Sequence, residues 1–324
     1  MKSLDDKLAR LRADPGDPGA FILADAKDAD LAFGLAAPGT DPATGRPRSL
    51  ADFRDQIREI VDQGLVDIML MSLSTSELLT VQERRFDRSD VTPAVRANDT
   101  TDIHMLAGAR YGRQPSQPFR SASVRQVTEH GGVDLGLYSI TPANDAEPDV
   151  RSLLAYREFR NEAAGAQLRH FLEVFPPNIP RLAPKDVGRF LNDFVARTLA
   201  GIPRADRPLF LKLPYCGADA MRALAEYDPQ LVPGILGGAS GTTYDAFYLL
   251  EQARRHGARA ALFGRKIKDS EHPLTFIRHL RLIADGQLGA ADGCRSYHSE
   301  LHRLGIRPIR SLDQDLQPTT AGER

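Results

Sequence analysis

A single lysine interrupts an otherwise apolar run in the second half of the chain. Lys212 lies within residues 208–214 (PLFLKLP), a run with the character of a buried strand. Because burying a charged ammonium costs free energy, such a lysine is either paired with a carboxylate or held in its neutral form. A neutral, desolvated lysine attacks carbonyl carbon and forms an imine. Lys212 is therefore a candidate catalytic residue, and a purely structural ion pair is the alternative.

Two carboxylates are candidates to assist Lys212. Glu173 interrupts the apolar run 171–175, one expected strand before Lys212, and Asp25 ends the apolar run 21–25. The carboxyl ends of neighbouring barrel strands lie at the same rim, where a carboxylate can transfer protons beside an imine nitrogen. We expect a catalytic role for both, and which is the main acid–base group stays open. The alternatives are a plain salt bridge for Glu173 and a turn or helix cap for Asp25.

Two glycine-rich segments follow Lys212 along the chain. Residues 233–243 read PGILGGASGTT and residues 261–266 read ALFGRK, and each leads into an expected helix. Backbone N–H groups at a helix N-terminus favour a dianion, and the loops after barrel strands seven and eight are the usual phosphate site. A lone pair of glycines is more often a turn, but two such loops in succession favour phosphate. The expected contacts are Gly237, Gly238, Ala239, Gly264 and Arg265.

A second lysine follows Asp25 by two residues. Lys27 is placed to contact a substrate phosphate, or to disfavour the charged form of Lys212 by like-charge repulsion. An ordinary solvated loop charge is the alternative. Arg96 and Ser139, at the ends of the third and fourth apolar runs, are further candidates for contacts with substrate hydroxyls.

The elements that must position these groups alternate along the chain. Eight short, continuously apolar runs are predicted strands, as is typical of parallel strands covered on both faces: residues 21–25, 66–71, 93–97, 133–139, 169–174, 208–213, 232–236 and 258–263. Amphipathic stretches with helical spacing are predicted helices at residues 49–63, 183–200, 243–256 and 273–285. This alternation predicts a closed (β/α)₈ barrel, a TIM barrel, with an open doubly wound sheet as the alternative.

One barrel domain is expected to span residues 1–310. Long Pro/Gly-rich loops are expected at residues 34–48, after the first strand, and at residues 111–120, after the third. Both fall on the side where barrel enzymes build their sites. Residues 311–324 are polar and are expected to fray as a C-terminal tail.

Composition argues against several classes of function. The formal net charge is -1, with 26% charged residues, which gives no support for a nucleic-acid partner. No apolar stretch approaches the ~20 residues that span a bilayer, and the N-terminus has no signal-peptide core, so no membrane association is expected. Two distant cysteines predict a reduced, cytoplasmic protein. His298 and His302 share a helix face without a third ligand, so no metal or other cofactor is expected.

Taken with their order, these residues resemble a known superfamily. Residues 208–286 are similar to the class I aldolase superfamily that contains deoxyribose-phosphate aldolase, tagatose-bisphosphate aldolase and archaeal-type fructose-bisphosphate aldolase. Lys212 is similar in position to the Schiff-base lysine, and the two glycine-rich loops are similar to the phosphate loops. Residues 25–27 (DAK) resemble the Asp-Gln-Arg segment of tagatose-bisphosphate aldolases, and Glu173 falls where those enzymes carry a glutamate acid–base group.

The resemblance implies a metal-independent lyase that cleaves or forms a carbon–carbon bond in a phosphorylated ketose. The archaeal branch uses a tyrosine proton donor on strand five, whereas the matching positions here are Glu173 and Phe175. A phosphosugar epimerase or isomerase, or a barrel that only binds a phosphorylated metabolite, are the alternatives. Barrels of this kind commonly self-associate, so a homo-oligomer is left open. The sugar, its stereochemistry and the number of its phosphates are not determined by the sequence.

Overall fold

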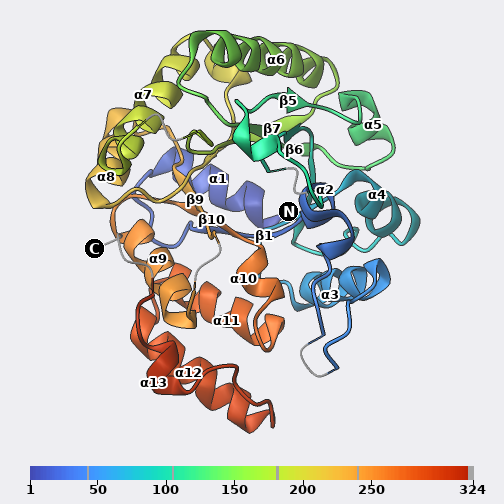
Figure 1. The fold of residues 1–324 in the computed structure, drawn as a ribbon, viewed down its shortest axis with the longest axis vertical. Coiled ribbons are helices and arrows are strands. Elements are labelled where there is room, and N and C mark those ends of the chain that lie inside the picture. The colour runs from blue at the N-terminus through green and yellow to red at the C-terminus, as the bar shows by residue number, and fades with distance from the viewer. Residues whose placement is uncertain (42–43, 104–105, 180–181, 239–240, 320–324) are drawn as a thin grey trace.

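A ring of eight parallel strands forms the centre of the computed structural model, which describes residues 1–41, 44–103, 106–179, 182–238 and 241–319 (Figure 1). The strands are β1 (Ile22–Lys27), β2 (Ile68–Met71), β3 (Thr92–Arg96), β6 (Leu135–Ile140), β7 (Arg169–Val174), β8 (Leu211–Lys212), β9 (Gly234–Leu236) and β10 (Ala260–Phe263). Their order around the ring is β8-β7-β6-β3-β2-β1-β10-β9. Each predicted strand overlaps one of these elements.

The ring closes between its first and last members. The backbone N–H of Leu211 donates to the carbonyl of Val232, and Leu213 and Leu236 continue the same parallel pairing between β8 and β9. A closed ring leaves no exposed sheet edge, which an open doubly wound sheet would have. The predicted (β/α)₈ barrel is therefore confirmed.

Helices surround this ring (Figure 1). They are α1 (Ser3–Ala13), α2 (Ala29–Phe33), α3 (Leu50–Gln63), α4 (Leu73–Ser76), α5 (Val124–Glu129), α6 (Ala146–Gly165), α7 (Val187–Ala200), α8 (Ala218–Tyr227), α9 (Thr243–Arg255), α10 (Arg265–Lys268), α11 (Pro273–Ala284), α12 (Ala290–Arg303) and α13 (Leu312–Asp315). The signals that predicted α3 are present: Ser49 caps its first turn in a capping box, and Gly64 ends it with φ 69°. No helix in the described part of the chain is long and apolar enough to cross a bilayer.

Alternation along the strands divides their side chains between two layers. On β1, Ile22 and Ala24 pack inside the barrel, whereas Leu23, and Phe21 directly before the strand, pack outside against the helices. The interior cluster contains apolar side chains from β1, β2, β3, β6, β7 and β10, together with Phe210, directly before β8. The barrel is therefore a packed core with its polar residues confined to the strand ends.

The N-terminal helix joins this interior cluster. Leu4, Leu8 and Leu11 of α1 pack with the inward-facing strand residues, and Figure 1 shows α1 behind the centre of the ring. Lys7 binds Asp67, which directly precedes β2, with 2.7 Å between Nζ and Oδ2. Because β2 begins at this end, α1 covers the amino-terminal end of the barrel, opposite the rim that carries the polar residues.

Replacing Leu8 with alanine should destabilise the fold. Leu8 is 4% exposed, and removing a buried leucine side chain costs about 2–5 kcal/mol of unfolding free energy. The measurement is chemical denaturation of both proteins. Leu35→Ala is the control, because Leu35 is 99% exposed and its loss should change stability by less than about 0.5 kcal/mol. Equal midpoints for Leu8→Ala and wild type would contradict the role given to α1.

Two segments expected to be irregular contain regular structure. Within residues 111–120, β5 (Pro118–Phe119) pairs antiparallel with β4 (Asp99–Thr100). In the predicted tail, α13 begins at a capping box on Ser311, and Asp315 is only 2% exposed. The expectation of a frayed tail is therefore wrong for residues 311–319. Asp315 and Thr319 form hydrogen bonds with the first turn of α9. These hydrogen bonds offset the conformational entropy that favours fraying. Residues 320–324 lie outside the described part.

Candidate active site

Polar side chains gather inside the barrel at the carboxyl end of neighbouring strands. Glu173 of β7 pairs in register with Ser139 of β6 on one side and with Lys212 of β8 on the other. Arg96 ends β3, which neighbours β6. Each of these positions continues the inward-facing alternation of its strand, so the barrel brings the four side chains together at one rim.

Lys212 and Glu173 form a buried ion pair. The Nζ of Lys212 lies 2.5 Å from Oε1 of Glu173, and the two residues are 5% and 1% exposed. The prediction that these side chains meet is thus correct in its geometry. An ammonium and a carboxylate at hydrogen-bond distance can exchange a proton, and general acid–base catalysis requires this reach.

Arg96 holds the other side of the Glu173 carboxylate. Its Nη2 lies 3.3 Å from Oε2 of Glu173, its Nη1 donates to Ser139 Oγ at 2.9 Å, and Ser139 Oγ donates to the same Oε2 at 2.7 Å. Arg96 Nε also donates to Oδ2 of Asp28 at 2.5 Å. Glu173 therefore presents one oxygen to Lys212 while its second oxygen is fixed by two donors.

Buried charges of both signs meet in this network. Lys212 and Arg96 provide two cations, Asp28 and Glu173 provide two anions, and a third carboxylate, that of Asp99, lies 3.9 Å from Arg96 Nη1. Burial alone would raise the pKa of Asp28, but Arg96 and then Lys212 outweigh burial and hold it below its ordinary value. Burial alone would lower the pKa of Arg96, but Asp28, Glu173 and Asp99 raise it. Arg96 therefore stays charged and remains a permanent partner of these carboxylates.

Asp25 and Lys27 do not join this network. They occupy the outward-facing positions of β1, beneath the helical layer, with 3.5 Å between Lys27 Nζ and Asp25 Oδ2 and with Nζ 5.8 Å from the Phe53 ring centroid. Burial raises the pKa of Asp25 to about 6 and lowers that of Lys27. The expectation that Asp25 reaches the rim beside Lys212 is corrected: strand alternation turns it outward and turns Asp28 inward.

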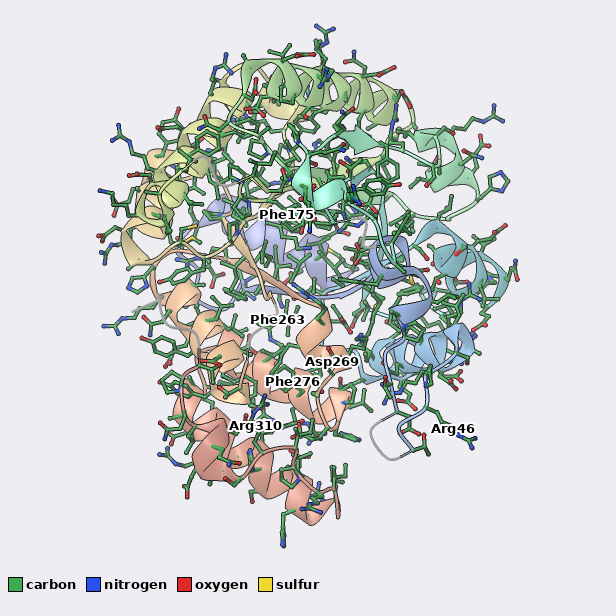
Figure 2. The ribbon with its side chains drawn as sticks, viewed as in Figure 1. Arg46, Phe175, Phe263, Asp269, Phe276 and Arg310 are labelled. Atoms are coloured by element: carbon green, nitrogen blue, oxygen red, sulfur yellow. The ribbon has the colours of Figure 1, made fainter. Side chains whose placement is uncertain are left out.

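A cavity of about 210 Å³ lies over the network. Its lining includes the network residues Lys212, Glu173, Arg96 and Asp28. It also includes five residues predicted for phosphate binding: Lys27, Gly237, Gly238, Gly264 and Arg265. Figure 2 labels Phe175, another lining residue, and Phe263 and Phe276, which pack in the outer layer. Ala239 lies outside the described residues.

The two glycine-rich loops meet this cavity in different ways. The N–H of Gly237 donates to the carbonyl of Leu262 at 2.7 Å, so it is not available for a phosphate. A Cβ at Gly237 would stand 2.2 Å from the Phe263 ring, and one at Gly264 would stand 2.5 Å from the Ala26 carbonyl oxygen. Both glycines are thus required by packing. Arg265 and Lys268 bring cationic side chains to the same part of the cavity.

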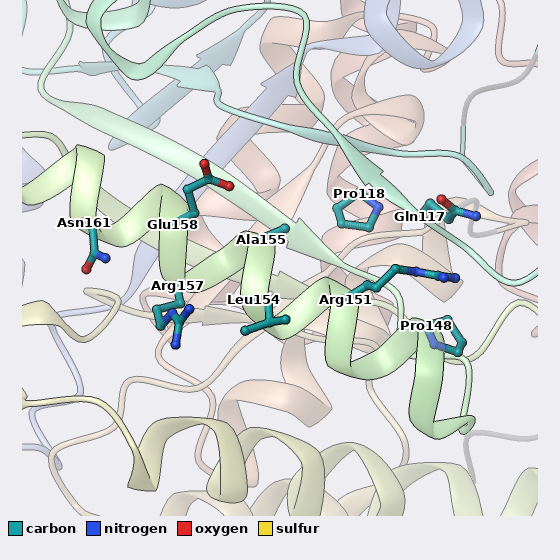
Figure 3. A pocket seen from close by; sticks show the side chains of 9 residues that line it. All are labelled: Gln117, Pro118, Pro148, Arg151, Leu154, Ala155, Arg157, Glu158 and Asn161. Atoms are coloured by element: carbon teal, nitrogen blue, oxygen red, sulfur yellow. The ribbon is translucent and has the colours of Figure 1, made fainter.

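A larger hollow of about 630 Å³ lies elsewhere, between α6 and residues 117–118 (Figure 3). Its charged side chains, including Arg151 and Glu158, are exposed and belong to the surface of α6. Water screens exposed charges of this kind, so their interactions contribute little free energy. The smaller cavity holds the buried network, so it is the candidate active site.

The sequence did not indicate Asp28 and gave Arg96 only a minor role. Asp28 lies one residue past the end of β1, beside several other charged residues, so its composition offers no distinction. The signal that could have found it is the two-residue alternation of strand side chains. The apolar interior positions Ile22, Ala24 and Ala26 are followed at the same spacing by Asp28. Arg96 carries the same signal, two residues after Ala94.

Solved structures with a similar fold are known, although no family model and no curated protein matches the sequence. An archaeal fructose 1,6-bisphosphate aldolase aligns with a TM-score of 0.63 and 17% identity, covering 87% of this chain and 99% of that chain. An archaeal fructose-1,6-bisphosphate aldolase whose catalytic Lys is covalently bound to the carbinolamine intermediate of its substrate gives the same TM-score and identity, covering 87% of this chain and 100% of that chain.

A third solved structure agrees with these two. The fructose-bisphosphate aldolase of Slackia heliotrinireducens aligns with a TM-score of 0.63 and 12% identity, covering 93% of this chain and 92% of that chain. Alignments this extensive show that the chain shares the barrel fold of these aldolases. The barrel fold that the resemblance in the sequence implied is therefore confirmed.

Proposed function

We propose that this protein is a class I aldolase that cleaves or forms a carbon–carbon bond in a phosphorylated ketose through an imine on Lys212. The observation that carries the proposal is the buried contact of 2.5 Å between Lys212 Nζ and Glu173 Oε1 on the wall of the cavity. An amine nucleophile needs a neighbouring group that accepts its proton, and this carboxylate is in reach.

The reaction begins with proton transfer from Lys212 to Glu173. The neutral amine adds to the ketone carbon of the substrate, and the carbinolamine loses water after Glu173 returns the proton to the hydroxyl group. The resulting iminium draws electrons from the neighbouring carbon–carbon bond, while a base removes the proton of the substrate hydroxyl and the aldehyde leaves. The enamine on Lys212 is then protonated, and water releases the ketone and the free amine.

Arg96 has a positioning role in this scheme. It holds Oε2 of Glu173 together with Ser139, so Oε1 stays directed at Lys212 in both protonation states of the carboxyl group. The link from Arg96 to Asp28 keeps the guanidinium in place. Fixed donors of this kind avoid reorganisation during each proton transfer.

The substrate phosphate is assigned to the part of the cavity formed by Gly238, Gly264, Arg265 and Lys268. Arg96 and Lys212 already face buried carboxylates. Arg265 begins α10 and Lys268 ends it, and the carboxylate nearest to Lys268, that of Asp269 at 3.3 Å, is exposed to solvent. A phosphate dianion gains most from cations that are not already neutralised by a buried partner. The phosphate and imine ends of the substrate are then held by different sets of residues.

The direct test is borohydride reduction in the presence of dihydroxyacetone phosphate, read by intact mass and peptide mapping. A stable adduct on the peptide containing Lys212 is the expected result, because borohydride reduces an imine to a secondary amine. If the protein is folded and binds the phosphate but no lysine carries an adduct, an imine with this donor is rejected. An epimerase or a binding protein on the same barrel would then be favoured.

Gly264→Ala tests the phosphate assignment. The new Cβ would displace the Ala26 backbone and with it the loop that begins α10. We expect the KM for the phosphorylated substrate to rise about 10- to 100-fold, as expected when one or two charge-assisted hydrogen bonds are lost. The KM for an unphosphorylated analogue should change less. Gly165→Ala is the control, because no atom lies within 4 Å of its added Cβ; equal effects on both substrates would contradict the assignment.

A further inference from the structure

Three side chains of metal-binding type meet away from the candidate active site. Cys294 and His298 lie one turn apart on α12, and Asp315 lies at the end of α13. One potential ligand atom from each residue lies within 4.8 Å of the other two, and all three residues are buried. They form the only such group found in the described residues. None of them lines the catalytic cavity.

We propose that Cys294, His298 and Asp315 form a structural zinc site. Zinc in proteins takes thiolate, imidazole and carboxylate ligands in tetrahedral arrangements, and this cluster offers one of each. The main-chain carbonyl of Asp315, 3.8 Å from Cys294 Sγ, is the fourth donor. The site is independent of the proposed aldolase chemistry.

The separations between these donors are close to those around one zinc ion. Zinc bond lengths place S, N and O ligands about 3.3–3.6 Å apart in a tetrahedron. Here His298 Nε2 lies 2.9 Å from Asp315 Oδ2, and Cys294 Sγ lies 3.9 Å from the same oxygen. These two separations lie within about half an ångström of the zinc values, and the third, between Cys294 Sγ and the His298 ring nitrogen, is within 4.8 Å.

Zinc binding must remove the proton of the Cys294 thiol and add positive charge near two cationic side chains. Burial, and then Asp315, raise the pKa of the Cys294 thiol to about 12, so the thiol is protonated without a metal. A zinc ion displaces that proton to solvent and binds the thiolate, and ligation through His298 Nε2 requires the tautomer with its proton on Nδ1. Lys266 and Arg310 face Asp315 and oppose added positive charge; Arg310, labelled in Figure 2, has Nη1 4.0 Å from Oδ1.

The site would fasten the C-terminal segment to the barrel. Asp315 Oδ1 accepts the backbone N–H of Thr243, the first residue of α9, at 2.8 Å. Thr319 binds the carboxylate of Asp245 in the same first turn. Because α9 follows β9 and its glycine-rich loop, a metal at Asp315 stabilises the start of α9 and the end of α13 together.

Cobalt(II) substitution tests the proposal on the full-length protein. After removal of metal with a chelator, Co²⁺ should produce visible d–d bands and a thiolate-to-cobalt charge-transfer band that saturate at one ion per chain. Zn²⁺ should abolish both bands by displacement and should raise the melting temperature. A chain that gives no thiolate band would overturn the proposal.

The two cysteines provide matched variants. Cys216→Ser should keep the thiolate band, because Cys294 is then the only thiol, and Cys294→Ser should lose it. Loss of the band in Cys216→Ser would assign the metal to Cys216 and sink the proposal. The Cys216→Ser result decides the matter even if Cys294→Ser does not fold. His298→Gln should shift the d–d bands or weaken Co²⁺ binding at least tenfold, whereas His302→Gln, at an exposed position on the same helix, should do neither.

Discussion

Lys212→Ala should reduce kcat for aldol cleavage by about 10⁴-fold or more, because it removes the group that forms the covalent intermediate. The barrel should survive the change. Glu173 loses one partner but keeps Arg96 and Ser139, so its carboxylate is not left buried without a donor. The measurement combines steady-state turnover with borohydride trapping. Binding of the phosphorylated substrate, followed by calorimetry, should persist because the phosphate end does not involve Lys212.

Lys212→Arg is the matched control for charge. A guanidinium can keep the ion pair with Glu173 but cannot form an imine, so this variant should be as inactive as Lys212→Ala and should give no adduct. Activity close to wild type in either variant would end the imine mechanism. An adduct that appears on Lys27 instead would identify a different nucleophile, since Lys27 also lines the cavity.

Much of this architecture follows from patterns that the sequence displays directly. Eight apolar runs of strand length, separated by amphipathic helices, admit few arrangements, and a parallel barrel buries both faces of every run. Lys212 and Glu173 were visible because each is a charge within an apolar run, which marks a buried ionisable group. Their contact was predictable because consecutive strands of a barrel lie next to each other.

What the sequence did not settle depends on contacts between distant segments. Asp25 and Asp28 are both aspartates beside the same strand end, and only the register of β1 decides which faces inward. The helical spacing of Leu4, Leu8 and Leu11 predicts an amphipathic helix. It does not predict that α1 packs against the open end of the barrel. Similarly, Cys294 and His298 approach Asp315 only because residues 311–319 fold back onto α9, and the local capping box at Ser311 does not specify that contact.

Glu173→Gln should lower kcat by about 10²- to 10⁴-fold, the range for loss of a general acid–base group. The amide has nearly the shape of the carboxyl group, and its oxygen can still accept from Ser139 and Arg96, so the packing of the rim is retained. It cannot accept a proton from Lys212. Single-turnover kinetics should therefore show slower formation of the reducible imine, with less change in the KM for the phosphorylated substrate.

Asp25→Asn is the matched carboxyl-to-amide change at the other residue proposed for proton transfer. Asp25 is fully buried on the outer face of β1 and makes its ion pair with Lys27, so its loss should affect stability while leaving kcat within a few-fold of wild type. The pair of variants separates the two candidates, because only a carboxyl group within reach of Lys212 can exchange its proton during turnover. If Asp25→Asn lost activity as severely as Glu173→Gln while remaining folded, proton transfer would have to pass through the outer face of β1, and the assignment to Glu173 would fail.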